Sequence, residues 1–256
     1  MSESVAKMKK AKQTLPEKPK GQVREYTEAI LVALLAALIL RTFVVQAFRI
    51  PTGSMKDTLL IGDFLLVNKF VYGARTPDGV PFLDISLPFF RLPAIKAPKP
   101  GEIIVFKYPK DEKLDYIKRC IAVGGQTLEM RDGIVYVDGE PEGEREFVKK
   151  EYDPEDGHYF NYYRVRTIRG QVYIIRYNAD PDLMMKNYGP VNVPHGNYFM
   201  MGDNRDNSSD SRAWGVLPAQ NVVGEAMVIY WSWDTSKPLL DLFNKVRWTR
   251  IGSLIK

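Results

Sequence analysis

The chain has 256 residues, of which 45% are hydrophobic and 26% charged, and this composition excludes a disordered or collagen-like chain. A single cysteine, Cys120, excludes an intramolecular disulfide, and two histidines are too few for zinc chemistry of the HExxH type, so no metal is expected. The net charge is +5, but residues 1–25 hold seven Lys and Arg against three Glu; the remainder is nearly neutral, and no nucleic-acid partner is expected.

The N-terminal part changes abruptly from polar to apolar. Residues 1–25 have few apolar side chains and predict a flexible basic tail. Residues 29–40 are an uninterrupted apolar run, AILVALLAALIL. Twelve helical residues cover only about 18 Å of the roughly 30 Å hydrocarbon core, so a spanning helix must extend further, and we place a membrane anchor at 26–48. The alternatives are a cleavable signal peptide, although no small-x-small triplet closes the run, and a buried core helix.

The charges around this run predict its orientation. Basic residues are concentrated before the apolar run, which favours a cytoplasmic tail and places residues 49–256 outside the membrane.

The rest of the chain predicts a β-rich domain. The proline-rich stretch 77–100 predicts a long extended loop, and the polar stretch 140–157 predicts a surface insertion. Strand-like runs alternate with turn formers at 64–73, 101–108, 115–123, 133–139, 169–177, 196–203 and 224–233.

Ser54 lies in a glycine-containing turn shortly after the apolar run. Pro51 and Gly53 favour a sharp turn that exposes the Ser54 hydroxyl, and Thr52 could aim a second hydroxyl at the same point. A serine in such a turn is usually only a turn former, and the GxSxG elbow is absent because Lys56 occupies its last glycine position. The turn alone is therefore weak evidence for a nucleophile.

A serine nucleophile needs a base, and Lys118 is the candidate. The two histidines lie in or beside the polar insertion, without a motif-like Asp. A lysine base must have its pKa lowered from about 10.4 to roughly 8, which requires an apolar setting. Lys118 lies in the middle of a predicted strand, with Tyr116 and Cys120 on the same face. The alternative is an edge-strand lysine that points to solvent.

Residues 202–215, GDNRDNSSDSRAWG, form a third polar cluster. A calcium loop is excluded because the glycine at its sixth position and the glutamate at its twelfth are missing. Residues 207–209 match a glycosylation sequon, which is common by chance in polar loops. A buried polar network fits better, with Ser208 orienting a neighbouring base and with pairing among Arg205, Asp206, Asp210 and Arg212.

Together, these segments resemble type I signal peptidases, the membrane-bound Ser/Lys proteases that remove signal peptides from exported proteins. The resemblance covers almost all of residues 26–256, and the most specific segment is GDNRDNSSDSR. The matching segments are IPTGSM, GDFLLVNKF, PGEIIVFKYP, DYIKRCIAVGG, VYVDGE, MGDNRDNSSDSRAWG and VRWTRIGSLIK.

The resemblance implies a role for each motif residue. It implies that Ser54 is the nucleophile, that Lys118 is the general base and that Ser208 orients this lysine. Thr52 would support the oxyanion hole. A structural ion-pair network would consist of Arg119, Asp210 and Arg212. The pockets for small substrate residues would be lined by Phe48, Ile50, Pro51, Met55, Tyr116 and Ile117.

The same resemblance implies a largely antiparallel β ectodomain, with a smaller inserted β region at about 126–190. It implies a single-pass protein of the bacterial cytoplasmic membrane that needs no cofactor. The expected partners are signal peptides of secreted preproteins, cut after a small-x-small motif, together with membrane lipid and the secretion machinery.

Two positions depart from the family pattern. Asp57 stands where a proline is usual, and it could loosen the turn after the nucleophile or place a carboxylate near the site. Thr52 replaces the common serine but keeps a hydroxyl.

Two competing hypotheses remain from the sequence. Self-cleaving Ser/Lys repressors would require an N-terminal DNA-binding domain, which the sequence lacks. A membrane-anchored scaffold without catalysis would not react with an acylating serine probe.

Overall fold

The computed structural model describes residues 22–76, 90–238 and 240–255, in two units that divide between Ile39 and Leu40. Helix α1 (Gln22–Phe43) is rich in Ala and Leu and buries none of its residues. Within the described ranges it is the one helix long and apolar enough to cross a membrane, with a mean hydropathy of 1.8. It begins earlier than the predicted anchor 26–48 and also ends earlier. It ends at Phe43 because the residues from Val45 form a β-strand.

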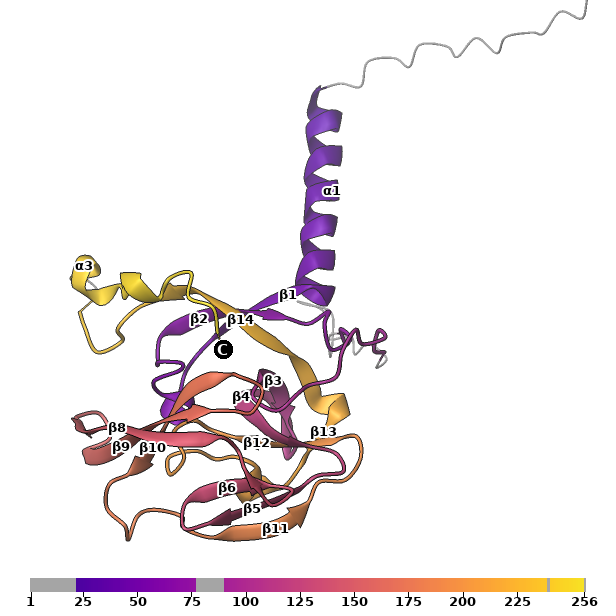
Figure 1. Ribbon diagram of the computed structural model, residues 1–256. Coiled ribbons are helices and arrows are strands. Elements are labelled where there is room, and N and C mark those ends of the chain that lie inside the picture. Colours follow the sequence, from indigo (N-terminus) through magenta and orange to yellow (C-terminus); the bar gives the residue numbers. More distant parts are fainter. Residues whose placement is uncertain (1–21, 77–89, 239, 256) are drawn as a thin grey trace, which may run out of the picture. The chain divides into compact units, whose positions relative to one another are not determined.

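The second unit is built around an antiparallel sheet of seven strands (Figure 1). Two strands flank Ser54, and the second of them pairs with the last strand of the chain. That last strand pairs on its other side with the first strand of the hairpin that carries Lys118. In spatial order its strands are β1 (Val45–Arg49), β2 (Asp63–Asn68), β14 (Val222–Ser232), β3 (Ile103–Tyr108), β4 (Asp111–Val123), β12 (Asn197–Met201) and β13 (Leu217–Pro218).

Two smaller antiparallel sheets arise from the residues between β4 and β12 (Figure 1). This is the stretch in which the sequence analysis places the insertion at about 126–190. One sheet consists of β10 (Val172–Asn178), β9 (His158–Arg166) and β8 (Glu144–Asp153). The other consists of β11 (Tyr188–Asn192), β5 (Thr127–Arg131), β6 (Ile134–Val137) and β7 (Glu140–Pro141).

Short helical turns complete the described structure. They are the 3-10 helices η1 (Gly53–Met55), η2 (Ala219–Asn221) and η3 (Trp248–Arg250), and the short helices α2 (Ser211–Trp214) and α3 (Leu242–Lys245).

The mainly β fold predicted from the sequence is confirmed. The polar stretch 140–157, predicted as a surface insertion, contains strand β8, whose side chains are nearly all exposed, so that no apolar alternation reveals the strand in the sequence. Residues 45–48, which the predicted anchor 26–48 includes, form most of strand β1, and their apolar side chains continue the apolar run of the helix. Part of the predicted loop 77–100 lies outside the described residues, and 90–100 contains no strand.

The hydrophobic core directly supports the turn at Ser54. Met55 and Leu59 are fully buried there and fix the chain on either side of Lys56 to the sheet. The cluster that receives them consists of Ile50, Leu65, Val67, Ile103, Val105, Val223, Ala226 and Ile229. Because these residues come from β2, β3 and β14 or from the turn itself, the sheet positions the candidate nucleophile.

Candidate active site

Ser54 lies in the 3-10 helix η1, between strands β1 and β2. The turn is closed by a hydrogen bond from the Lys56 amide to the Gly53 carbonyl, 3.0 Å long. The Leu59 amide donates to the Met55 carbonyl at 2.7 Å. Ser54 itself is 9% exposed, so its hydroxyl lies at the margin of the core rather than free in solvent.

Lys118 projects from the middle of β4 and meets this serine. Its Nζ lies 2.6 Å from Ser54 Oγ and 3.0 Å from the Ile117 carbonyl oxygen. Lys118 is 4% exposed, and its Nζ is 5.5 Å from the centre of the Tyr116 ring. Because β4 pairs on both sides, with β3 and β12, the alternative of an edge-strand lysine in solvent is excluded.

The surroundings of Lys118 favour the neutral amine. Burial lowers its pKa to about 8, although the carboxylates of Asp203 and Asp210 partly oppose that shift. A substantial fraction of this lysine is therefore neutral near pH 8, which is the form able to accept a proton from a hydroxyl.

The loop after β12 holds the backbone of the serine turn. The Asn204 amide donates to the Ser54 carbonyl at 3.1 Å, and its side-chain Nδ2 donates to the Gly53 carbonyl at 3.0 Å. The close approach also requires Gly202, since a Cβ at that position would lie 2.4 Å from the Ser54 carbonyl oxygen. Sequence analysis did not assign a role to Asn204, although it lies within the GDNRDNSSDSR motif.

Arg119 and Asp203 form a fully buried ion pair behind the site. Arg119 Nε and Nη2 donate to the two Asp203 carboxylate oxygens at 2.8 and 2.7 Å, and both side chains are 0% exposed. Asp203 also accepts a 2.5 Å hydrogen bond from the Thr58 hydroxyl, four residues after Ser54. The network predicted for Arg119 therefore includes Asp203, which the sequence analysis had not named as a partner.

The other predicted ion pairs are only partly present. Arg212 Nε and Nη2 donate to the Asp210 carboxylate at 2.9 and 2.8 Å, as expected. Arg205 instead pairs with Glu142 at 2.8 Å, a residue of the inserted region. Asp206 accepts hydrogen bonds from backbone amides, because the loop wraps against residues 178–185.

The two hydroxyls predicted to support the reaction, those of Ser208 and Thr52, differ in burial. Ser208 Oγ is buried and has no hydrogen-bond partner within the described residues. Ser208 Oγ and the Ser54 carbonyl oxygen both lie against Gly202. A Cβ added to this glycine would be 2.3 Å from the first and 2.4 Å from the second. Thr52 is exposed and extended, with φ −130° and ψ 156°. Its hydroxyl is therefore accessible to a peptide that approaches Ser54.

A protein-family model described as signal peptidase, peptidase S26, matches residues 23–231. The chain belongs to this family. The signal peptidase I of Pseudomonas aeruginosa is 36% identical over 89% of this chain and 78% of its own length. That of Aquifex aeolicus is 35% identical over 82% of this chain and 85% of its own. A crystal structure of a signal peptidase I from Enterococcus faecalis V583 matches 51% of this chain and 97% of that chain, with 24% identity and a TM-score of 0.30.

Membership of the signal peptidase family confirms the resemblance found in the sequence, and the chain is a serine endopeptidase of the signal peptidase I type. The family match spans Ser54, Lys118 and the whole GDNRDNSSDSR segment. The roles of individual residues are inferred below from their geometry in this chain.

The six residues predicted to line the substrate pockets differ in their exposure. Ile50 and Met55 are 2% and 0% exposed and belong to the core, so their side chains offer almost no surface to a substrate. The four with accessible surface are Phe48, Pro51, Tyr116 and Ile117.

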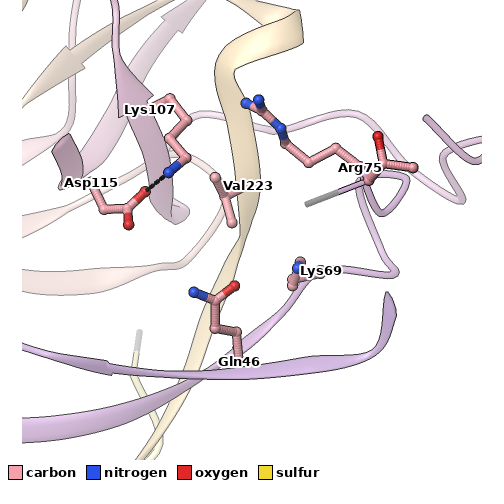
Figure 2. Close-up of a pocket in the computed structure, with 7 residues that line it drawn as sticks. Gln46, Lys69, Arg75, Lys107, Asp115 and Val223 are labelled. Carbon is pink, nitrogen blue, oxygen red and sulfur yellow. Dashed lines mark ion pairs between the residues drawn. The ribbon is translucent and has the colours of Figure 1, made fainter. Parts of the chain in front are cut away.

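Figure 2 shows a pocket of about 160 Å³ whose lining includes neither Ser54 nor Lys118. Its ionic contact joins Lys107 to Asp115 at 3.2 Å. It is lined by Gln46, Lys69, Arg75, Thr76, Lys107, Asp115 and Val223. In the part of the chain that the structure describes, no group of His, Cys, Asp or Glu side chains could hold a metal ion.

Proposed function

We propose that this enzyme removes N-terminal signal peptides from secreted preproteins, with Ser54 as the nucleophile and Lys118 as the general base. The observation that supports this proposal is the 2.6 Å contact between the Ser54 hydroxyl and a buried lysine amine. A serine hydroxyl is hardly ionised at neutral pH and needs such a base at hydrogen-bond distance.

The proposed reaction proceeds through an acyl-enzyme. Neutral Lys118 takes the proton of Ser54 Oγ as this oxygen attacks the scissile carbonyl carbon. The resulting lysinium gives the proton to the leaving amine of the mature protein, and an ester to Ser54 remains. Lys118, neutral again, then takes a proton from a water that attacks the ester carbonyl. The lysinium returns this proton to Ser54 Oγ as the signal peptide leaves with a free carboxylate. The exposed Thr52 hydroxyl would donate to the oxyanion. The buried Ser208 hydroxyl, which makes no hydrogen bond to Lys118 in this structure, would have to turn toward Nζ to orient the lysinium.

The proposed substrate pockets accept small side chains one and three places before the cleaved bond. Phe48, Pro51, Tyr116 and Ile117 offer the surface, and packed core residues lie behind them. A Leu at either substrate position would have to push into packed side chains, which costs about 1 to 3 kcal/mol and corresponds to a roughly tenfold to hundredfold loss of kcat/KM.

One set of assays tests this function. The wild-type enzyme should cleave a preprotein with Ala at both positions, and its Ser54 should react with an acylating serine probe. Ser54→Ala should lose both properties while keeping the same circular dichroism. A Leu substrate should be cleaved poorly by the wild-type enzyme, and Ile117→Ala should partly relax that discrimination. Cleavage by Ser54→Ala would refute the nucleophile, and equal cleavage of both substrates would refute the pocket assignment.

The proposed topology places the basic residues 1–25 in the cytoplasm and the catalytic domain, residues 49–256, outside a bacterial cytoplasmic membrane. It is supported by the exposed apolar surface of α1 and by the basic residues before it. Membrane lipid around α1 and the secretion machinery that delivers preproteins would then be its partners. Protease added to intact spheroplasts should digest the catalytic domain and spare an N-terminal tag, and protection of the domain would refute this orientation.

A further inference from the structure

The two residues after the Ser54–Met55 turn enter an ion cluster that the proposed reaction does not use. The cluster joins this turn to the β8–β9 hairpin and to strand β10 of the three-stranded sheet. Its members are Lys56, Asp57, Asp153, Glu155, Asp156 and Arg176.

Lys56 makes the closest contacts between the turn and the hairpin. Its Nζ is 2.6 Å from both Asp153 Oδ2 and Glu155 Oε2, and 3.8 Å from Asp156 Oδ2. The side chain is 14% exposed, and its carboxylate partners raise its pKa although burial opposes them. This lysine is therefore charged and held on the hairpin at neutral pH.

Arg176 connects the same hairpin to the loop that holds the serine backbone. Its Nη1 and Nη2 donate to Asp153 and Asp156 at 2.6 and 2.5 Å, and its side chain is 0% exposed. The Arg176 amide donates to the Asp203 carbonyl at 3.0 Å, next to the Asn204 that bonds to Ser54. The turn is thus held from two directions by connected contacts, through Lys56 and through Asn204.

Asp57 stands where a proline is usual, in a backbone conformation that does not accept proline. Its φ is 80°, a left-handed conformation that proline cannot adopt and that Asp tolerates better than most residues. Its carboxylate lies 4.0 Å from Arg176 Nε, so the departure places a carboxylate toward the ion cluster. A non-glycine residue in this conformation persists only where its surroundings enforce it. The contacts of Lys56 on one side and the buried Leu59 on the other provide that constraint.

We propose that Lys56 is a positioning residue, whose ion pairs with Asp153 and Glu155 hold the turn so that Ser54 Oγ stays against Lys118 Nζ. The inference rests on the proposed role of Ser54 as nucleophile. The hairpin 153–158 acts as a brace for the nucleophile, although it contributes no group to the reaction. Because a misplacement of about 1 Å can cost on the order of 100-fold in rate, loosening this brace should lower turnover.

Steady-state kinetics on matched variants tests the proposal. Lys56→Gln should lower kcat about tenfold and change KM less than twofold, whereas Lys56→Arg should keep at least half of the wild-type kcat. Arg164→Gln is the control, because Arg164 in β9 also pairs with a carboxylate, Glu146 at 2.9 Å, but both side chains are exposed and neither belongs to the cluster. The control should match the wild type. An unchanged kcat for Lys56→Gln, or a loss confined to KM, would overturn the proposal.

Two further measurements separate positioning from folding and from the identity of the nucleophile. Circular dichroism well below the unfolding temperature measures the amount of folded enzyme, and kcat is calculated from that amount. If Lys56→Gln does not fold, Glu155→Gln removes one partner and decides the question, with an expected twofold to threefold loss of kcat and rejection if kcat is unchanged. Cleavage by Ser54→Ala would instead refute the proposed nucleophile, whereas full activity of the Lys56 and Glu155 variants would refute only the brace.

Discussion

Two lysines lie at the serine turn and differ in almost every physical respect, since Lys118 contacts Ser54 and Lys56 follows it in the chain. Lys118 comes from the seven-stranded sheet, is 4% exposed and contacts a hydroxyl and a carbonyl, and burial lowers its pKa to about 8. Lys56 lies in the turn, is 14% exposed and contacts two carboxylates at 2.6 Å, and its pKa is raised. Burial thus lowers the pKa of the lysine that has no carboxylate in direct contact with its amine, so that this lysine can act as a base. Where carboxylates contact the amine, they outweigh burial and the lysine stays charged.

The same contrast separates the two parts of the catalytic unit. The large sheet supplies the candidate nucleophile, the base and the core beneath them. The three-stranded sheet supplies carboxylates that hold the turn from outside. The proposed reactive groups therefore come from the sheet with the apolar core, and the more exposed insertion contributes charged contacts to the serine turn.

Arginine substitution at each lysine should give the largest difference between the two regions. Guanidinium does not lose its proton in proteins, so Lys118→Arg should lower kcat/KM by at least about a thousandfold, whereas Lys56→Arg keeps its ion pairs and most of its activity. Cleavage of a preprotein by the two purified variants measures this. Appreciable turnover by Lys118→Arg would remove lysine from the mechanism and end the contrast.

The pH dependence should report on Lys118 and not on Lys56. In the proposed mechanism the active form has a neutral Lys118 amine, so kcat/KM should rise about tenfold per pH unit below pH 8 and level off above it. The Lys56→Gln variant should show the same midpoint at a lower plateau, because Lys56 stays protonated throughout this range. A profile that is flat between pH 6 and about 9 would contradict a lysine base.

Stability should show the smallest effects, with opposite signs at the two lysines. Lys118→Met removes a buried amine and should stabilise the fold by roughly 1 to 3 kcal/mol at neutral pH. Lys56→Met removes the lysine partner of Asp153 and Glu155 and should destabilise the fold by about 1 kcal/mol. Each should move the unfolding temperature by a few degrees, measured by calorimetry of the two variants. A destabilised Lys118→Met would show that its amine is better solvated than the structure indicates.

The pH dependence of the free energy of unfolding gives a further test of the same variants. The folded pKa of Lys118 is about 8 and the unfolded value is 10.5, so between these values the unfolded state binds more protons and wild-type stability should rise with pH. The folded pKa of Lys56 is raised above 10.5, so its contribution is complete below that value and is lost only as pH rises through the folded pKa. The advantage of Lys118→Met should therefore shrink between pH 8 and about 10.

The sequence alone determined the features that are encoded by neighbouring residues. The apolar run predicts α1, alternation and turn formers predict most strands of the large sheet, and the mid-strand position of Lys118 predicts its burial. Each of these signals depends on side chains within a few positions of one another, which a local period or motif can reveal.

Only the tertiary structure decided which distant polar groups meet. Lys56 and Glu155 are 99 positions apart, Asn204 and Gly53 are 151 apart, and Arg119 and Asp203 are 84 apart. Strand β8 likewise exists through its pairing with β9, because its exposed polar side chains carry no apolar period. Charged and amide side chains have several equally good partners in a sequence, and only the packing of the sheets selects among them.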